Sequence, residues 1–302
     1  MEVSKSADLF PEPPEELIER LRRKLPTLQM LPAVATQALE IARQPDCSIA
    51  AFSGVVERDL KLAADILKMA NSVLYSTGTP VASLHQAVVR LGFHHCRSVI
   101  VSSSYDSLTR TLGAEEQASR ELLTRHGFLT AIFALRLNHC LHLGFQGEEF
   151  TAGLMHDIGR LLLSVAAPET FREADPLDFQ ETGELEDRER EAFGVSHAEF
   201  GAWFADQSDL PQPLVAAIRF HHAPKDAGTH RRLAALTAAA DELANFVQRP
   251  GRSEDEEYDP ATNDAVRLLE RIGAAGAEDK FAANAAQLIR ECPGMAESLM
   301  QG

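Results

Sequence analysis

The chain has 302 residues, of which 45% are hydrophobic and 25% are charged, and its formal net charge is -16 at pH 7. This length suffices for a sizeable core in one large domain or two smaller ones. The negative charge repels nucleic-acid backbones and anionic membranes, so we expect neither as a partner. No apolar run is long enough to cross a bilayer, and the N-terminus lacks the apolar core of a signal peptide, which predicts a cytoplasmic protein.

Hydrophobic periodicity predicts an all-α chain, because apolar residues recur at three- and four-residue spacing and no alternating strand pattern is present. Ala and Leu, which favour helices, are abundant, whereas aromatic residues make up only 6% of the chain. In chain order we predict a loose tail, an N-terminal helical subdomain, a second helical block, an acidic linker and C-terminal helices, at residues 1–13, 14–112, 113–248, 249–260 and 261–302.

Within the second block, the stretch GLMHDIGRLLL (residues 153–163) places His156 and Asp157 next to each other in an apolar segment. A buried carboxylate costs several kcal/mol unless a partner compensates its charge. On a helix the two neighbours would lie about 100° apart, so that both side chains can reach one site. Further candidate ligands lie in helical surroundings, which gives the set His126, His156, Asp157, His197, His221, His222 and Asp241.

Local patterns place several of these residues at helix ends. The sequence SHAE is typical of a capping box with Ser196 at the N-cap, which predicts His197 in the first turn of a helix. His221 and His222 precede Pro224 and are therefore expected at a helix C-terminus. The acidic stretch 169–191 is interpreted as a solvated loop and helix face.

Imidazoles combined with carboxylates suit Fe, Mn, Zn or Co, and an aspartate can bridge two ions. A two-metal site of this kind generates hydroxide and holds a phosphoryl group, which predicts phosphate-ester hydrolysis. Each histidine taken alone also has a simpler explanation as a hydrogen-bonded core residue. Only the ordered set favours a metal site.

The order His, His-Asp, His, His-His, Asp on consecutive helices resembles the HD superfamily of metal-dependent phosphohydrolases. The blocks LPTLQMLPAVATQALEIA, ERDLKLAADILKMANSVLYS and SLHQAVVRLGF, followed by AGLMHDIGRLLL, narrow this resemblance to the HD-related output domain (HDOD) family. The resemblance covers about residues 25–247. It implies an HD-domain-like helical bundle with an N-terminal helical subdomain, and a regulatory role in bacterial signal transduction.

The resemblance also implies roles for individual residues. The HD metal ligands correspond to His126, His156, Asp157 and Asp241. A second ion, as in the cyclic-di-GMP phosphodiesterase relatives, would be held by His197 and His221, with His222 as a further contact.

Three departures from those relatives argue against cyclic-di-GMP hydrolysis. Leu122 stands where the relatives with a third metal carry a glutamate, and HHAPKDAG replaces their Gly-Tyr-Pro segment after the double histidine. Arg160 replaces their lysine and keeps a positive charge that could meet a phosphate.

Three functions are therefore open. We favour a non-enzymatic regulatory module whose HD pocket binds one or two divalent ions (Fe, Mn or Zn) and which acts through a signalling protein partner. The second is a metal-dependent phosphohydrolase or phosphodiesterase for a phosphate-containing ligand, with Asp157 and Arg160 as catalytic residues. The third, a nucleic-acid regulator using the N-terminal helices, is disfavoured by the net charge. We expect the two helical subdomains to join near Gly113.

Overall fold

A computed structural model describes residues 11–25, 31–44, 46–72, 74–110, 117–180, 184–253 and 255–301. Within these ranges the ordered elements are helices and none is a strand, which confirms the predicted all-α fold. Most of the expected tail, residues 1–10, and the expected junction at Gly113 lie outside the described residues.

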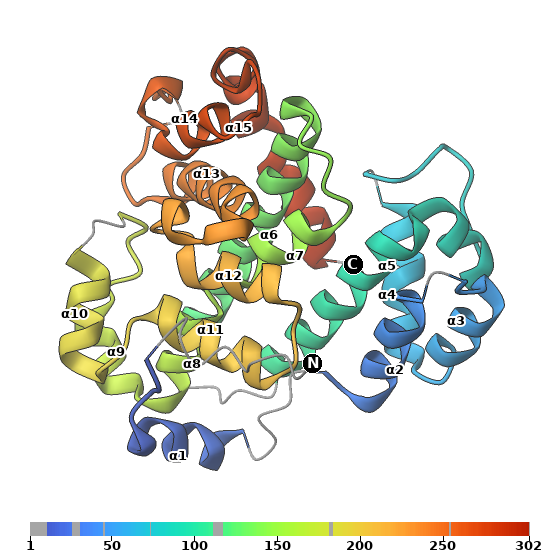
Figure 1. The fold of residues 1–302 in the computed structure, drawn as a ribbon, viewed down its shortest axis with the longest axis horizontal. Helices are drawn as coiled ribbons and strands as arrows, with labels where there is room; N and C mark the ends of the chain where they lie inside the picture. The colour runs from blue at the N-terminus through green and yellow to red at the C-terminus, as the bar shows by residue number, and fades with distance from the viewer. Residues whose placement is uncertain are drawn as a thin grey trace.

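The N-terminal lobe, on the right of Figure 1, packs four neighbouring helices together. Ser48 and Asp59 begin two of them by accepting hydrogen bonds from backbone N–H groups three residues further on, as N-cap residues do. The last helix bends at Gly92, whose φ of 70° is readily adopted only by glycine. The helices are α2 (Ala33–Ala42), α3 (Ile49–Val56), α4 (Leu60–Asn71) and α5 (Leu84–Arg110).

The second lobe is built around α6, which packs against α7, α13 and the C-terminal helix α15. A further layer is formed by α8 and α11, which pack against each other, and by α12, which joins α11 to α13. The bounds are α6 (Gln117–Leu141), α7 (Glu148–Met155), α8 (Ile158–Ala166), α11 (His197–Gln207), α12 (Gln212–Phe220), α13 (Arg231–Gln248) and α15 (Ala277–Gln301).

Smaller elements surround this second lobe (Figure 1). Helices α9 and α10 lie at its left edge, and α14 packs on α13 and α15. The bounds are α9 (Pro168–Ala174), α10 (Glu184–Phe193) and α14 (Asp264–Arg271), with short 3-10 turns η2 (Pro224–Asp226), η3 (Gly228–His230) and η4 (Pro260–Thr262).

Helix α1 (Glu15–Lys24) differs from the sequence-based expectation in its position. We expected it within the N-terminal subdomain, but it packs against α8 of the second lobe (Figure 1). Its buried face consists of Leu17, Ile18 and Leu21. An amphipathic helix of this kind can bury its apolar side on any exposed apolar surface, and periodicity does not say which one.

Glycines allow the helices around the HD segment to approach closely. A Cβ atom on Gly153 would lie 2.8 Å from the Cα of Ala131, so α7 could not pack as closely on α6. A Cβ atom on Gly159 would lie 1.9 Å from the carbonyl oxygen of His197, so α8 could not reach α11. The two glycines therefore bring His156 and Asp157 close to residues of α6 and α11.

None of the described helices combines the length and apolar character that a bilayer span requires.

Candidate metal centre

His156 and Asp157 lie at a break between two helices. Helix α7 ends at Met155 and α8 begins at Ile158, which differs from the expected placement of the pair within a helix. Asp157 leaves helical geometry with φ -97° and ψ 15°, and the Nδ1–H of His156 donates to the carbonyl of Gly153 at 2.7 Å. The break keeps both side chains in the interior, where His156 is 0% and Asp157 4% exposed.

A first cluster of donor atoms joins α6, the α7–α8 break and α13. The Nε2 atom of His126 lies 2.9 Å from Oδ1 of Asp241 and 3.2 Å from Nε2 of His156. Oδ2 of Asp157 lies 3.7 Å from each of these two nitrogens. We call these four residues cluster 1.

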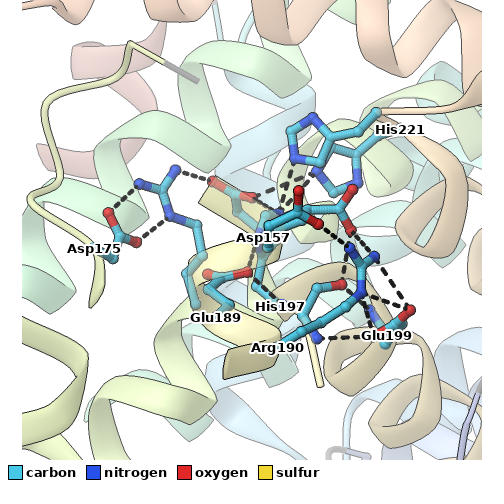
Figure 2. A network of polar contacts seen from close by, with 12 residues as sticks. Asp157, Asp175, Glu189, Arg190, His197, Glu199 and His221 are labelled. Carbon is cyan, nitrogen blue, oxygen red and sulfur yellow. Dashed lines mark hydrogen bonds and ion pairs between the residues drawn. The ribbon is translucent and has the colours of Figure 1, made fainter. Parts of the chain in front are cut away.

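A second cluster joins α11 to the C-terminal end of α12. The Nε2 atom of His197 lies 3.3 Å from Nε2 of His221 and 3.0 Å from Nε2 of His222. Oδ1 of Asp157 lies 3.5 Å from the nitrogen of His197 and 3.7 Å from that of His221. These three histidines form cluster 2, and Figure 2 shows Asp157 beside His197 and His221. Asp157 thus presents one oxygen to each cluster.

Hydrogen bonds at the Nδ1 atoms of four histidines determine that the other ring nitrogen, Nε2, faces the clusters. In each ring Nδ1 lies within hydrogen-bond distance of an oxygen that can only accept, so Nδ1 carries the proton. The acceptors are Gln248 Oε1 for His126, Gly153 O for His156, Glu189 Oε2 for His197 and Ile218 O for His221, at 2.7–2.9 Å. Their Nε2 lone pairs therefore face inward in the neutral rings. This is the usual arrangement of metal-binding histidines.

The donor atoms fit a pair of metal ions. Lone pairs on atoms about 3 Å apart repel each other unless a proton or a cation lies between them. On a four- or six-coordinate ion with bonds of about 2.1 Å, adjacent donors lie roughly 3.0–3.4 Å apart, close to the separations within each cluster. Oδ1 of Asp157 is buried and accepts no hydrogen bond from the described residues. A cation would compensate this oxygen.

The buried carboxylates favour the protonated form of two of the histidines. Burial lowers the pKa of His156, but Asp157 and Asp241 outweigh that effect and raise the pKa to about 9. Burial likewise lowers the pKa of His197, but Glu189 and Asp157 raise it to about 10. His221 behaves in the opposite way, because burial and its two charged histidine neighbours lower its pKa to about 4. Without an ion, protons on some of the rings supply the positive charge that metal cations would otherwise supply.

Arg160 is fully buried and bonded to carboxylates, a position that differs from the expectation of a phosphate contact. Its Nη1 donates to Oδ2 of Asp157 at 2.9 Å, and its Nε and Nη2 donate to the two oxygens of Asp175 at 2.7 and 2.9 Å. Figure 2 shows Asp175 on the side of Asp157 away from His221. In this arrangement the guanidinium holds Asp157 in place.

The segment after α9 closes the centre from solvent. The ring of Phe179 stacks on His126 with centroids 4.9 Å apart and an interplanar angle of 24°, and Phe179 is 4% exposed. Leu177 and Phe179 both adopt positive φ values near 50°, which are unusual for residues other than glycine. Among the residues of the two clusters, only His222 is exposed.

We expect Phe179→Ala to accelerate metal release from the loaded protein. A stacked ring pair contributes roughly 1 kcal/mol, and 1.4 kcal/mol is a tenfold change, so the rate of transfer to a chelator should rise about fivefold. Phe93→Ala is the matched control, because it removes a ring that packs on Phe52 in the N-terminal lobe. Equal release rates in both variants would show that Phe179 does not close the site.

All seven predicted ligands lie in this centre, and His197 lies in the first turn of α11 behind the predicted capping box at Ser196. Glu189 was not among the predicted site residues, and it is 0% exposed although we interpreted its acidic stretch as solvated. A signal was present, since Leu185, Glu189 and Phe193 recur every four residues and share the buried face of α10. Nothing in the local pattern pointed to Gln248, Asp175 or Phe179.

The described residues form an all-helical fold with two neighbouring clusters of histidine and aspartate side chains. The family model of the HDOD domain matches residues 28–224, and the chain belongs to this family.

Two solved structures share this fold, and one curated protein shares part of the sequence. The structure of an HDOD domain protein with unknown function from Geobacter sulfurreducens has a TM-score of 0.72 and 21% identity, covering 94% of this chain and 98% of that one. A Shewanella amazonensis protein named as a candidate phosphohydrolase has a TM-score of 0.67 and 24% identity with the same coverage. An uncharacterized protein of Treponema pallidum (strain Nichols) is 26% identical over 198 residues, which are 64% of this chain and only 37% of that protein's length.

Proposed function

We propose that this chain is a signalling module of the HDOD family whose HD pocket holds two divalent ions, Fe, Mn or Zn, and which acts mainly through a protein partner. The observation that carries this proposal is the placement of Asp157 between clusters 1 and 2, with one carboxylate oxygen toward each. Cluster 1 would hold one ion and cluster 2 the other.

Burial favours a regulatory role over open catalysis. The ligands come from α6, the α7–α8 break, α11, α12 and α13, so bound ions would tie these elements together and stabilise one arrangement of the lobe. Phe179 covers His126, and among the residues of the two clusters His222 alone is exposed to solvent. Occupancy of the centre would then be communicated to a partner through the helices it ties together.

The alternative is a metal-dependent phosphohydrolase acting on a nucleotide or another phosphate ester. It is favoured by the shared carboxylate, because a pair of ions on such a ligand activates water and neutralises phosphoryl oxygens. In that case a substrate would approach from the side of His222. Arg160 would act by holding Asp157, since its own donors are bonded to Asp157 and Asp175.

A substrate screen separates these functions. Protein loaded with Mn or Fe is incubated with phosphomonoesters, cyclic nucleotides and cyclic dinucleotides, beside Asp157→Ala treated identically. The regulatory proposal expects no phosphate release above that of the variant. Metal-dependent turnover that disappears in Asp157→Ala would overturn it in favour of the hydrolase.

A further inference from the structure

Glu189 is a buried carboxylate whose hydrogen bonds and ion pair among the described residues all involve one metal-ligand candidate. Its Oε2 accepts hydrogen bonds from Nδ1 of His197 at 2.7 Å and from the backbone N–H of His197 at 2.8 Å. Its Oε1 is buried and has no hydrogen-bond partner among the described residues. Among the same residues, His197 is also its only ion-pair partner. A fully buried carboxylate of this kind requires a positive charge nearby.

The two clusters differ in the charge of their own ligands. Cluster 1 contains two carboxylates, Asp157 and Asp241, whereas cluster 2 consists of three imidazoles and only shares Asp157. A second divalent ion close to the first is repelled by it, and neutral imidazoles do not offset that repulsion.

The groups behind three of the other histidines are neutral. His126 is backed by the amide of Gln248, and His156 and His221 are backed by backbone carbonyls. Among these four histidines, His197 alone is backed by a carboxylate.

We propose that Glu189 is a positioning residue that enables cluster 2 to hold its ion. Its carboxylate fixes the ring of His197 with Nε2 toward the cluster and supplies, one hydrogen bond away, the negative charge that the ligands of cluster 2 lack. The inference rests on the proposed two-ion pocket and adds an asymmetry: the ion at cluster 2 depends on Glu189 and the ion at cluster 1 does not.

Local structure explains how this carboxylate comes to lie beside His197. Glu189 lies on the buried face of α10, and the chain turns at Gly194, where φ is 79°, before α11 begins. The bond to the backbone N–H of His197 also satisfies a donor in the first turn of α11, which has no partner within the helix. Glu189→Gln keeps an acceptor for these N–H groups and removes the charge, so it is the informative change.

The test is a titration of the metal-free 302-residue chain with Co²⁺ against a competing chelator, followed by the visible absorption of bound Co²⁺. Wild-type protein should take up two equivalents. Groups behind metal ligands typically contribute 10–100-fold to affinity, so Glu189→Gln should weaken one equivalent by about that factor and leave the other nearly unchanged. Gln248→Ala, the matched change behind His126, should weaken the other equivalent instead.

Glu189→Asp keeps the charge on a shorter side chain and separates charge from packing. It should retain more of the affected equivalent than Glu189→Gln, with thermal unfolding of the metal-free variants showing that each is folded. Two equivalents in wild type with unchanged affinities in Glu189→Gln, or equal weakening of both, would overturn this inference alone. Failure of the wild type to bind Co²⁺ would overturn the proposed pocket and this inference with it.

Discussion

Asp157→Ala is expected to empty both halves of the metal centre. Oδ2 of Asp157 faces His126 and His156, and Oδ1 faces His197 and His221, so one substitution removes a ligand from each cluster. Asp241 would be the only carboxylate left among the ligands. The buried positive charge of Arg160, which pairs with Asp157 in the wild type, would also remain next to the centre. Metal content should therefore fall from two equivalents per chain to near zero.

The control for this variant is Glu57→Ala, which removes an exposed acid in the N-terminal lobe. It should retain the wild-type metal content, measured on proteins purified in parallel. Folding of Asp157→Ala is followed by thermal unfolding, and Arg160 keeps its two bonds to Asp175 in that variant. A full complement of metal in Asp157→Ala would remove the basis for a shared carboxylate.

Gly159→Ala is expected to have the largest effect on stability. A Cβ atom at this position would lie 1.9 Å from the carbonyl oxygen of His197 and 2.7 Å from its carbonyl carbon. These are backbone atoms that no rotamer change can move, so α8 would have to separate from α11. We expect a loss of more than about 4 kcal/mol in the free energy of unfolding, within the range of severe core disruptions, or failure to fold.

Gly54→Ala is the matched control for Gly159→Ala. Gly54 lies in α3, and a Cβ atom there would meet nothing within 4 Å. Alanine is preferred over glycine inside a helix by roughly 0.5–1 kcal/mol, so this variant should be at least as stable as wild type. Chemical denaturation of both variants gives the comparison. Wild-type stability of Gly159→Ala would mean that α8 and α11 are not packed as described.

The helical class and the ends of several helices follow from local sequence. Ser196 and Glu199 form the predicted capping box, which places His197 in the first turn of α11. His221 directly follows the last residue of α12, as predicted from Pro224, which lies three residues further on. These features depend on interactions between residues a few positions apart, which sequence patterns report directly.

Features that depend on contacts between distant segments were not predictable in this way. The hydrophobic periodicity did not indicate that α1 packs against α8, or that Phe179 stacks on His126. Arg160 was expected to meet a ligand because its charge is visible in the sequence, whereas its carboxylate partner Asp175 lies after a separate helix. Only the tertiary structure brings these groups together.

Metal content per chain, measured by mass spectrometry on freshly purified wild-type protein, shows whether the pocket holds two ions. We expect two equivalents of Fe, Mn or Zn. Absence of bound metal, even after anaerobic loading, would contradict it and would mean that His156, Asp157 and their neighbours form a proton-linked polar core.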